Sequence, residues 1–330
     1  MKMKNICYIL FTVSILFACN DDPVLIKDPI NSLSNDCIKR SLPIAPNIAG
    51  NEIEFAYAMA LPQAAGVLTS AQVVASIAGA EGTYFDPNSY YTNNSGQDIP
   101  VLVANESQTS GTTTSTEFLV DTCAATLRYY YMIPQEAKGK EVEFVFSVNA
   151  SNGQKAEYKM GPYQISRMDM TLSQNLDAEH CYLSFHDPNV ALKIYTKAEI
   201  EANPSLLSEV DIMYGYSELG DLSHAFYTKS SPADYMDGIS LPEGFVNDTK
   251  MLEVYGLRDR QLANLQYSNF IDDLDFEKLD MGRSISYALG LKGESGVWLE
   301  TSDGAFRAFV YVNEVESGMM TVSVKRYPMK

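Results

Sequence analysis

The chain has 330 residues, of which 46% are hydrophobic and 20% are charged. These values are typical of a globular protein and argue against a disordered or collagen-like chain. The formal net charge is −18, and it becomes −20 if Lys2 and Lys4 are removed with a signal segment. Such acidity argues against nucleic acid or an anionic membrane surface as a partner, because both repel a negatively charged protein.

The first 18 residues are typical of a signal peptide. A short basic start precedes an apolar stretch from Ile6 to Ala18, which is too short to cross a bilayer because that takes ~20 residues. The stretch ends in Leu16-Phe17-Ala18-Cys19, which resembles the lipobox of bacterial lipoproteins. The resemblance implies that residues 1–18 are cleaved off and that Cys19 carries a lipid. The alternative is an ordinary secretory signal in which Cys19 has no special role.

A lipidated tether is predicted over residues 19–45, because proline, asparagine and serine recur there. Asn20-Asp21-Asp22 follows Cys19 directly and resembles the surface-export signal of lipoproteins from Bacteroidota. The resemblance implies that the lipid on Cys19 holds the protein in the outer membrane, facing the cell exterior. The alternative is that the two aspartates only give the tether a soluble start.

An immunoglobulin-like β-sandwich is predicted over residues 46–165. Residues 52–61 alternate between large apolar and polar or small side chains, as a half-buried strand does, and residues 142–148 repeat the pattern. Ser151-Asn152-Gly153 is typical of a hairpin turn. Short strands at this spacing favour an antiparallel sandwich. Residues 69–78 are ambiguous and permit a helix.

An α+β domain dominated by antiparallel sheet is predicted over residues 166–330, so the expected fold class is mainly β. Thr196 and Glu199 have the spacing of a capping box, which predicts a short helix that ends before Pro204. Ser302-Asp303-Gly304 is typical of a turn between two strands near the C-terminus.

Three parts of the chain together resemble the two-domain surface lipoproteins of Bacteroidota, a largely uncharacterised class. They are Leu16-Phe17-Ala18-Cys19, the pattern Tyr129-Tyr130-Tyr131…Pro134…Lys138-Gly139-Lys140…Phe144-Val145-Phe146, and Trp298…Thr301-Ser302-Asp303-Gly304. Members of this class are described as adhesion or glycan-binding proteins. The resemblance therefore implies a binding role, and it supplies no active-site residues.

A segment rich in aromatic and polar residues, from Tyr84 to Gly96, is predicted to be a long loop with a recognition surface. Sugar binding usually needs exposed aromatic rings beside amides and carboxylates. The candidate ligand-binding residues are Tyr84, Tyr90, Tyr91, Asn93 and Asn94. The alternative is that these tyrosines only pack at the rim of the sandwich.

No motif predicts an enzyme, a cofactor or a metal site. The segment around Ser217 approaches a nucleophile elbow, but its second glycine comes one place too late. His180, His186 and His224 are too dispersed to predict a zinc site. The acidic residues 272–280 lack the glycine of a calcium-binding loop.

Three cysteines remain in the predicted mature chain besides Cys19, namely Cys37, Cys123 and Cys181. An odd number permits one disulfide and leaves at least one free thiol, and the pairing stays open. A bond between Cys37 and Cys123 would tie the tether to the sandwich.

We therefore expect a non-enzymatic, surface-exposed lipoprotein that acts in binding or cell adhesion, with a glycan or a protein as its ligand. The first alternative is a glycan-binding accessory protein of a polysaccharide-uptake system. The second alternative is a hydrolase whose site is assembled from dispersed residues.

Overall fold

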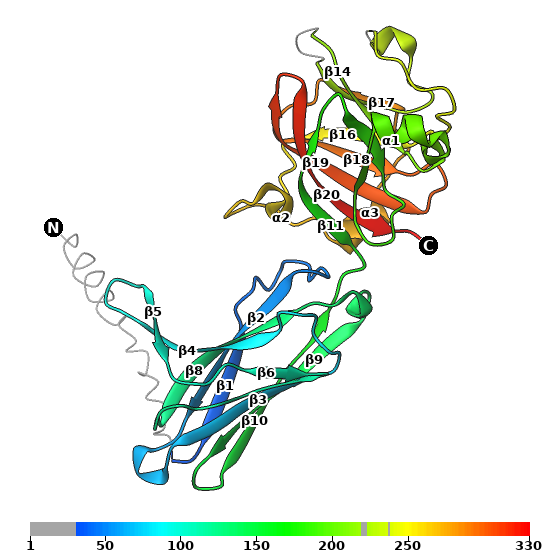
Figure 1. Ribbon diagram of the computed structural model, residues 1–330. Helices are drawn as coiled ribbons and strands as arrows, with labels where there is room; N and C mark the ends of the chain where they lie inside the picture. The colour runs from blue at the N-terminus through cyan, green and yellow to red at the C-terminus, as the bar shows by residue number, and fades with distance from the viewer. Residues whose placement is uncertain (1–30, 219–222, 237) are drawn as a thin grey trace, which may run out of the picture.

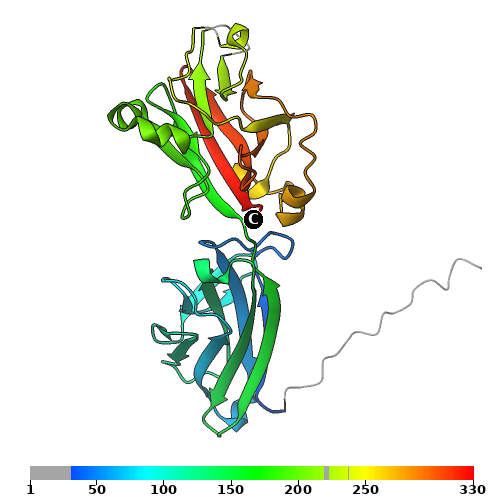
Figure 2. The ribbon, with the colours of Figure 1, turned by 90° about the vertical axis from the view of Figure 1, so that its right-hand side faces the viewer.

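The computed structural model describes residues 31–218, 223–236 and 238–330. The predicted signal peptide 1–18, Cys19 and residues 20–30 of the predicted tether lie outside this part of the chain. Within it, four five-stranded sheets form two domains that lie end to end (Figure 1, Figure 2). Neighbouring strands in these sheets are antiparallel, so the predicted mainly β fold is confirmed. No helix in the described residues is long and apolar enough to cross a membrane.

The first domain is a sandwich of two antiparallel sheets, which confirms the predicted immunoglobulin-like architecture. The first sheet has the order β1 (Ser34–Lys39), β2 (Glu52–Ala60), β8 (Ala124–Met132), β4 (Tyr84–Thr92), β5 (Asp98–Leu102). The second sheet has the order β10 (Lys155–Gln164), β9 (Glu141–Ala150), β3 (Leu68–Ala75), β7 (Thr113–Glu117), β6 (Gln108–Ser110). Two short 3-10 helices lie in the connections, η1 (Gln63–Ala65) and η2 (Gln135–Ala137). The ambiguous residues 69–78 thus belong largely to a strand, β3.

Aromatic side chains fill the space between the two sheets of the first domain. The ring of Phe55 on β2 lies 4.8 Å from that of Phe144 and 5.3 Å from that of Phe146, both on β9. Tyr129 on β8 meets Phe146 edge-on at 5.8 Å. Because side chains alternate along a strand, the intervening residues of β2 and β8 project from the outer face of the first sheet.

The strand β1 lies inside the range predicted to be a tether, and that prediction is wrong for these residues. Ser34 lies opposite Ala60 and Lys39 opposite Phe55, so β1 pairs with β2 along its whole length. The side chain of Cys37 is buried in the sandwich core. An edge strand needs few apolar side chains, which is why the polar composition of this segment concealed it.

The second domain consists of two further antiparallel sheets with short helices, which agrees with the predicted α+β domain. One sheet has the order β11 (Asp169–Leu176), β20 (Met319–Pro328), β19 (Phe306–Glu316), β18 (Ser295–Glu300), β16 (Lys250–Tyr255). The other has the order β13 (Lys193–Thr196), β12 (His180–Ser184), β14 (Ile212–Tyr216), β15 (His224–Tyr227), β17 (Tyr287–Leu289). The helices are α1 (Lys197–Ala202), η3 (Pro204–Ser208), η5 (Ala233–Tyr235), α2 (Arg260–Ala263) and α3 (Asp273–Lys278).

The predicted capping box opens α1. The Thr196 hydroxyl accepts a hydrogen bond from Glu199 N at 3.1 Å, and Thr196 N donates to the Glu199 carboxylate at 2.8 Å. The helix ends at Ala202, before Pro204, as predicted.

The two domains are in direct contact through both apolar and charged side chains. Ile48, in the loop between β1 and β2, is fully buried in the second-domain cluster that contains Trp298. Lys138 of the first domain forms an ion pair with Asp169 on β11 of the second. A buried side chain, an ion pair and a hydrogen bond from Gln261 Nε2 to Pro46 O at 3.3 Å therefore join the two domains.

Candidate functional site

Most of the segment predicted to be a recognition loop is the strand β4, which ends at Thr92, so the prediction of a loop is wrong for these residues. Tyr84 lies opposite Tyr130 of β8, and Tyr90 and Tyr91 lie opposite Pro100 and its neighbour on β5. Aromatic residues favour strands, because their side chains pack well on a pleated surface. Here that preference outweighs the turn signals of the proline and asparagines in the same segment.

Two of the predicted tyrosines lie on the outer face of the first sheet. Tyr84 is 43% exposed and stacks on Tyr130, with ring centroids 5.0 Å apart. Tyr90 lies against the Arg128 guanidinium, whose carbon is 3.8 Å from the ring centroid. Arg128 and Tyr130 alternate with buried residues on β8, so both project from this face. We call these four residues the outer-face patch.

A carboxylate holds the Tyr90 ring in place from the same strand. The Tyr90 hydroxyl donates a hydrogen bond to Asp86 Oδ2 at 2.5 Å. This bond, and then burial, raises the pKa of Tyr90 to about 12. Tyr90 therefore stays a neutral hydrogen-bonding and stacking group at any physiological pH.

The charged groups around the patch are paired with one another. Arg128 Nη2 lies 2.5 Å from Asp98 Oδ2, and Arg40 Nε lies 2.8 Å from Glu54 Oε1. Each of these two guanidinium groups also lies within 4 Å of the other carboxylate, at 3.8 Å for Arg40 with Asp98 and 3.7 Å for Arg128 with Glu54, so the four groups form one ion-pair network. The face suits a neutral polar ligand better than an anion, because an anion would have to displace one of these carboxylates.

An open trough of about 590 Å³ continues from the patch along the same face. Small side chains of β2 and β8 line it, including Ala58, Ala60 and Thr126, and Tyr90 borders it on β4. Asp36 lines it from β1, on the other side of these two strands. The trough thus combines an aromatic ring on one side with a carboxylate acceptor on the other.

The other three predicted residues do not join the patch. Tyr91 follows Tyr90 on the strand, so its side chain points to the opposite face. The Asn93 side-chain oxygen accepts two backbone N–H groups of the β4–β5 turn, at 2.9 and 3.0 Å. Asn94 is exposed in the same turn. The five candidates are therefore divided between the outer face, the opposite face and a turn.

Arg128 and Tyr130, which complete the patch, were not among the predicted ligand-binding residues. Their signal was present, because the apolar Leu127 and the ring of Tyr129 alternate with them along the strand. The alternation places both on one outward face, but it does not show that β4 is the neighbouring strand.

The three histidines lie in separate contacts of the second domain. Their side-chain partners differ: Asp177 for His180 at 3.0 Å, Asp211 for His186 at 3.1 Å, and Tyr214 for His224 at 2.8 Å. Among residues 31–218, 223–236 and 238–330, no three metal-binding side chains are grouped in a way that could hold an ion.

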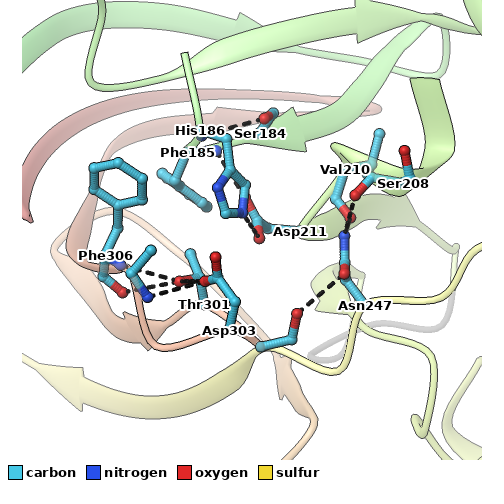
Figure 3. A network of polar contacts seen from close by, with 12 residues as sticks. Ser184, Phe185, His186, Ser208, Val210, Asp211, Asn247, Thr301, Asp303 and Phe306 are labelled. Atoms are coloured by element: carbon cyan, nitrogen blue, oxygen red, sulfur yellow. Dashed lines mark hydrogen bonds and ion pairs between the residues drawn. The ribbon is translucent and has the colours of Figure 1, made fainter. Parts of the chain in front are cut away.

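The polar network around His186 has a buried acid at its centre (Figure 3). Asp211 is fully buried and accepts Phe185 N at 2.7 Å as well as the His186 ring. The bond to Asp211 raises the pKa of His186, although burial opposes it. The ring also meets Phe306 edge-on at 5.5 Å. Within the described chain, Asp211 alone is hydrogen-bonded to this ring, so the network does not pair the histidine with a nucleophile.

The three cysteines of the described chain are all unbridged. Cys37 and Cys181 are buried, whereas Cys123 is half-buried. The structure therefore does not contain the possible bond between Cys37 and Cys123.

Comparison with known proteins gives matches for both domains. The description "Domain of unknown function (DUF4466)" matches residues 30–165, and "Domain of unknown function (DUF8576)" matches residues 166–329. A DUF4466 family protein from Parabacteroides merdae, known from its crystal structure, is 66% identical over 91% of this chain and 100% of its own, with a TM-score of 0.90. The chain belongs to the DUF4466 family. That relative comes from the Bacteroidota, the group to which the lipoprotein resemblance points.

Two other solved structures are much less similar to this DUF4466 protein. The major pilin subunit BcpA of Bacillus cereus, in a variant form, is 9% identical over 51% of this chain and 54% of its own, with a TM-score of 0.30. A C-terminal fragment of the major pilin of Streptococcus agalactiae is 13% identical over 53% of this chain and 71% of its own, with a TM-score of 0.29. Scores this low carry no argument about fold or function. No curated protein matches the chain.

Proposed function

We propose that this DUF4466 protein is a non-enzymatic binding or adhesion protein, held in the outer membrane by a lipid on Cys19 and exposed to the cell exterior. The observation that carries the proposal is the outer-face patch with its adjoining trough. The segment Leu16-Phe17-Ala18-Cys19 supports the anchor through its resemblance to a lipobox.

The composition of the patch supports a binding role. Tyrosine and arginine are enriched among the residues that dominate binding energies, because they offer a large contact area together with hydrogen-bonding groups. Stacking of Tyr84 on Tyr130 and of Tyr90 on Arg128 also holds these side chains in place before a ligand arrives. A patch ordered in advance loses less conformational entropy on binding.

A glycan-binding accessory protein is the second candidate, and the trough favours it. Its floor of small side chains offers little of the apolar area that anchors a protein partner. A sugar ring needs a flat aromatic surface and hydrogen-bonding groups at its edge, which Tyr90 and Asp36 supply. The paired charges on this face favour a neutral chain over an acidic one.

A glycan-array screen of the full mature chain from residue 20 tests the ligand class. We expect Tyr90→Ala to weaken a selective signal about tenfold or more, as the loss of a central contact does. Tyr267→Ala is the matched control, because Tyr267 is a second-domain tyrosine that is 82% exposed. A blank array for the wild-type chain contradicts the glycan candidate, and equal signals from both variants contradict the patch as its site.

An adherence assay on whole cells tests the broader proposal independently. Cells that display the protein should lose adherence when Tyr90→Ala and Arg128→Ala are combined, while surface levels measured with an antibody stay unchanged. Incorporation of radiolabelled fatty acid into the wild-type chain, but not into Cys19→Ala, checks the anchor. Adherence that is unchanged in the double variant contradicts the role of the outer-face patch.

A further inference from the structure

A pocket of about 320 Å³ opens in the second domain, separate from the outer-face patch. Gly215 and Tyr216 at the end of β14 line it, as do Cys181 at the start of β12 and Gly318 in the turn before β20. The strand β20 runs from this turn to the C-terminus, which lies beside the first domain (Figure 1). The pocket therefore lies at the end of the second domain that points away from the first.

The pocket runs from an exposed rim to a buried floor. Ala178 and Lys197 at its rim are exposed, whereas Met213 and Tyr214 deeper inside are buried. Tyr182 is a second buried ring in its wall. Its volume is at the lower end of the range for small-molecule sites, and its walls are mainly aromatic and apolar, as in such sites.

A glycine allows the covering segment to approach the sheet at this point. A Cβ atom at Gly215 would lie 2.6 Å from Cδ1 of Ile239 and 2.8 Å from the Tyr227 ring, closer than real Cβ contacts. Residues 238–240 therefore lie directly on β14 and form one wall of the pocket. The concave shape depends on this close packing.

The two charged groups at the rim differ in their partners. The Asp177 carboxylate accepts Glu179 N at 2.8 Å and His180 N at 2.7 Å, and it also contacts the His180 ring. The Lys197 ammonium, by contrast, forms no ion pair or side-chain hydrogen bond with the described residues. It lies near enough to the pocket floor to oppose the burial that raises the pKa of Cys181 to about 11.

From this geometry we infer a second binding site, which takes a small molecule with one six-membered ring and a carboxylate. The ring packs against Tyr182 and Met213, which lie opposite each other on neighbouring strands and share one face of the sheet. The carboxylate pairs with Lys197 at the rim. This inference does not depend on the function proposed for the outer-face patch.

Calorimetric titration of the full mature chain with 3-phenylpropionate tests the site, and the neutral alcohol 3-phenylpropanol is the matched ligand. We expect a Kd of about 1 mM or tighter for the acid, from the few tenths of a kcal/mol that each non-hydrogen atom contributes. Lys197→Gln should weaken the acid about tenfold and leave the alcohol unchanged, because only the acid carries the paired charge. Lys229→Gln is the control variant, because Lys229 is exposed and does not line the pocket, and it should leave the affinity for both compounds unchanged.

Ala178→Trp places a large ring at the exposed rim and should abolish binding of both compounds, with the unfolding temperature unchanged. Absence of saturable binding by the wild-type chain up to about 20 mM acid would overturn the inference. Equal affinity of wild-type and Lys197→Gln for the acid would overturn the assigned charge recognition. Unchanged binding in Ala178→Trp would place the compounds elsewhere and overturn the site.

Discussion

Ile48 offers the sharpest test of how the two domains depend on each other. It comes from the first domain, yet its side chain is fully buried in the apolar cluster of the second. Ile48→Ala removes three buried carbon groups at ~0.8 kcal/mol each, which is about 2.4 kcal/mol. The cavity that remains adds to this cost, so we expect a loss of about 2–4 kcal/mol in the free energy of unfolding.

The only tryptophan of the chain makes this loss measurable. Trp298 belongs to the same cluster and packs against Phe309 with ring centroids 4.6 Å apart. Its fluorescence during urea unfolding therefore reports on the second domain. Ile44→Ala is the control, because Ile44 is in the same loop but 77% exposed, and it should change stability by less than ~0.5 kcal/mol. If the urea midpoints of the two variants coincide, Ile48 does not couple the domains and the reasoning fails.

Three further predictions concern single groups. Lys325→Met should lower the free energy of unfolding in urea by about 3 kcal/mol. The substitution removes the ammonium group that lies 2.7 Å from the fully buried Asp259 carboxylate. Backbone N–H groups still donate hydrogen bonds to that carboxylate, which limits the loss. His186→Gln should destabilise the protein more at about pH 5.5 than at about pH 8.5, as followed by thermal unfolding at both pH values. The hydrogen bond to Asp211 raises the pKa of His186 in the folded protein. The stabilisation from this bond is therefore complete below a pH of ~6.5, the pKa of an unperturbed histidine, and is lost as the pH rises through the pKa of His186 in the folded protein. A thiol reagent added to the native chain from residue 20 should modify Cys123 alone, because Cys37 and Cys181 are buried. All three thiols should react once the chain is denatured. Rapid reaction of all three in the native protein would contradict the burial of Cys37 and Cys181.

The fold could be predicted where apolar side chains recur with a regular period. Residues 52–61 and 142–148 became β2 and β9, because one face of each strand is buried against the other sheet. The helix after Thr196 could also be predicted, since a capping box is a local interaction between residues three apart. Such signals lie within a few residues of the structure that they specify.

The parts that could not be predicted depend on partners distant in sequence. β1 lacks a strong apolar pattern and forms because β2 offers it a ladder of hydrogen bonds. The tyrosines of β4 were predicted to be in a loop because turn residues surround them, yet pairing with β8 decides their conformation. The stacking of Tyr84 on Tyr130 joins residues more than forty positions apart, and no single-sequence pattern contains that contact.

The proposed anchor and the contacts between the domains together determine which surfaces a partner can reach. β1 runs from Ser34 to Lys39, and Lys39 lines a cleft shared with Asp273 of the second domain, so Ser34 is at the end of the first domain remote from the second. If Cys19 carries the lipid, the second domain points away from the membrane, because the tether enters at that remote end. Ile48 and the ion pair of Lys138 with Asp169 stabilise this arrangement. With that anchor, the pocket beside Lys197 lies at the end of the second domain remote from the membrane, and the outer-face patch lies along the side of the domain nearer to it. A soluble small molecule reaches the pocket unhindered, and a long chain that lies parallel to the cell surface is better suited to the outer-face patch.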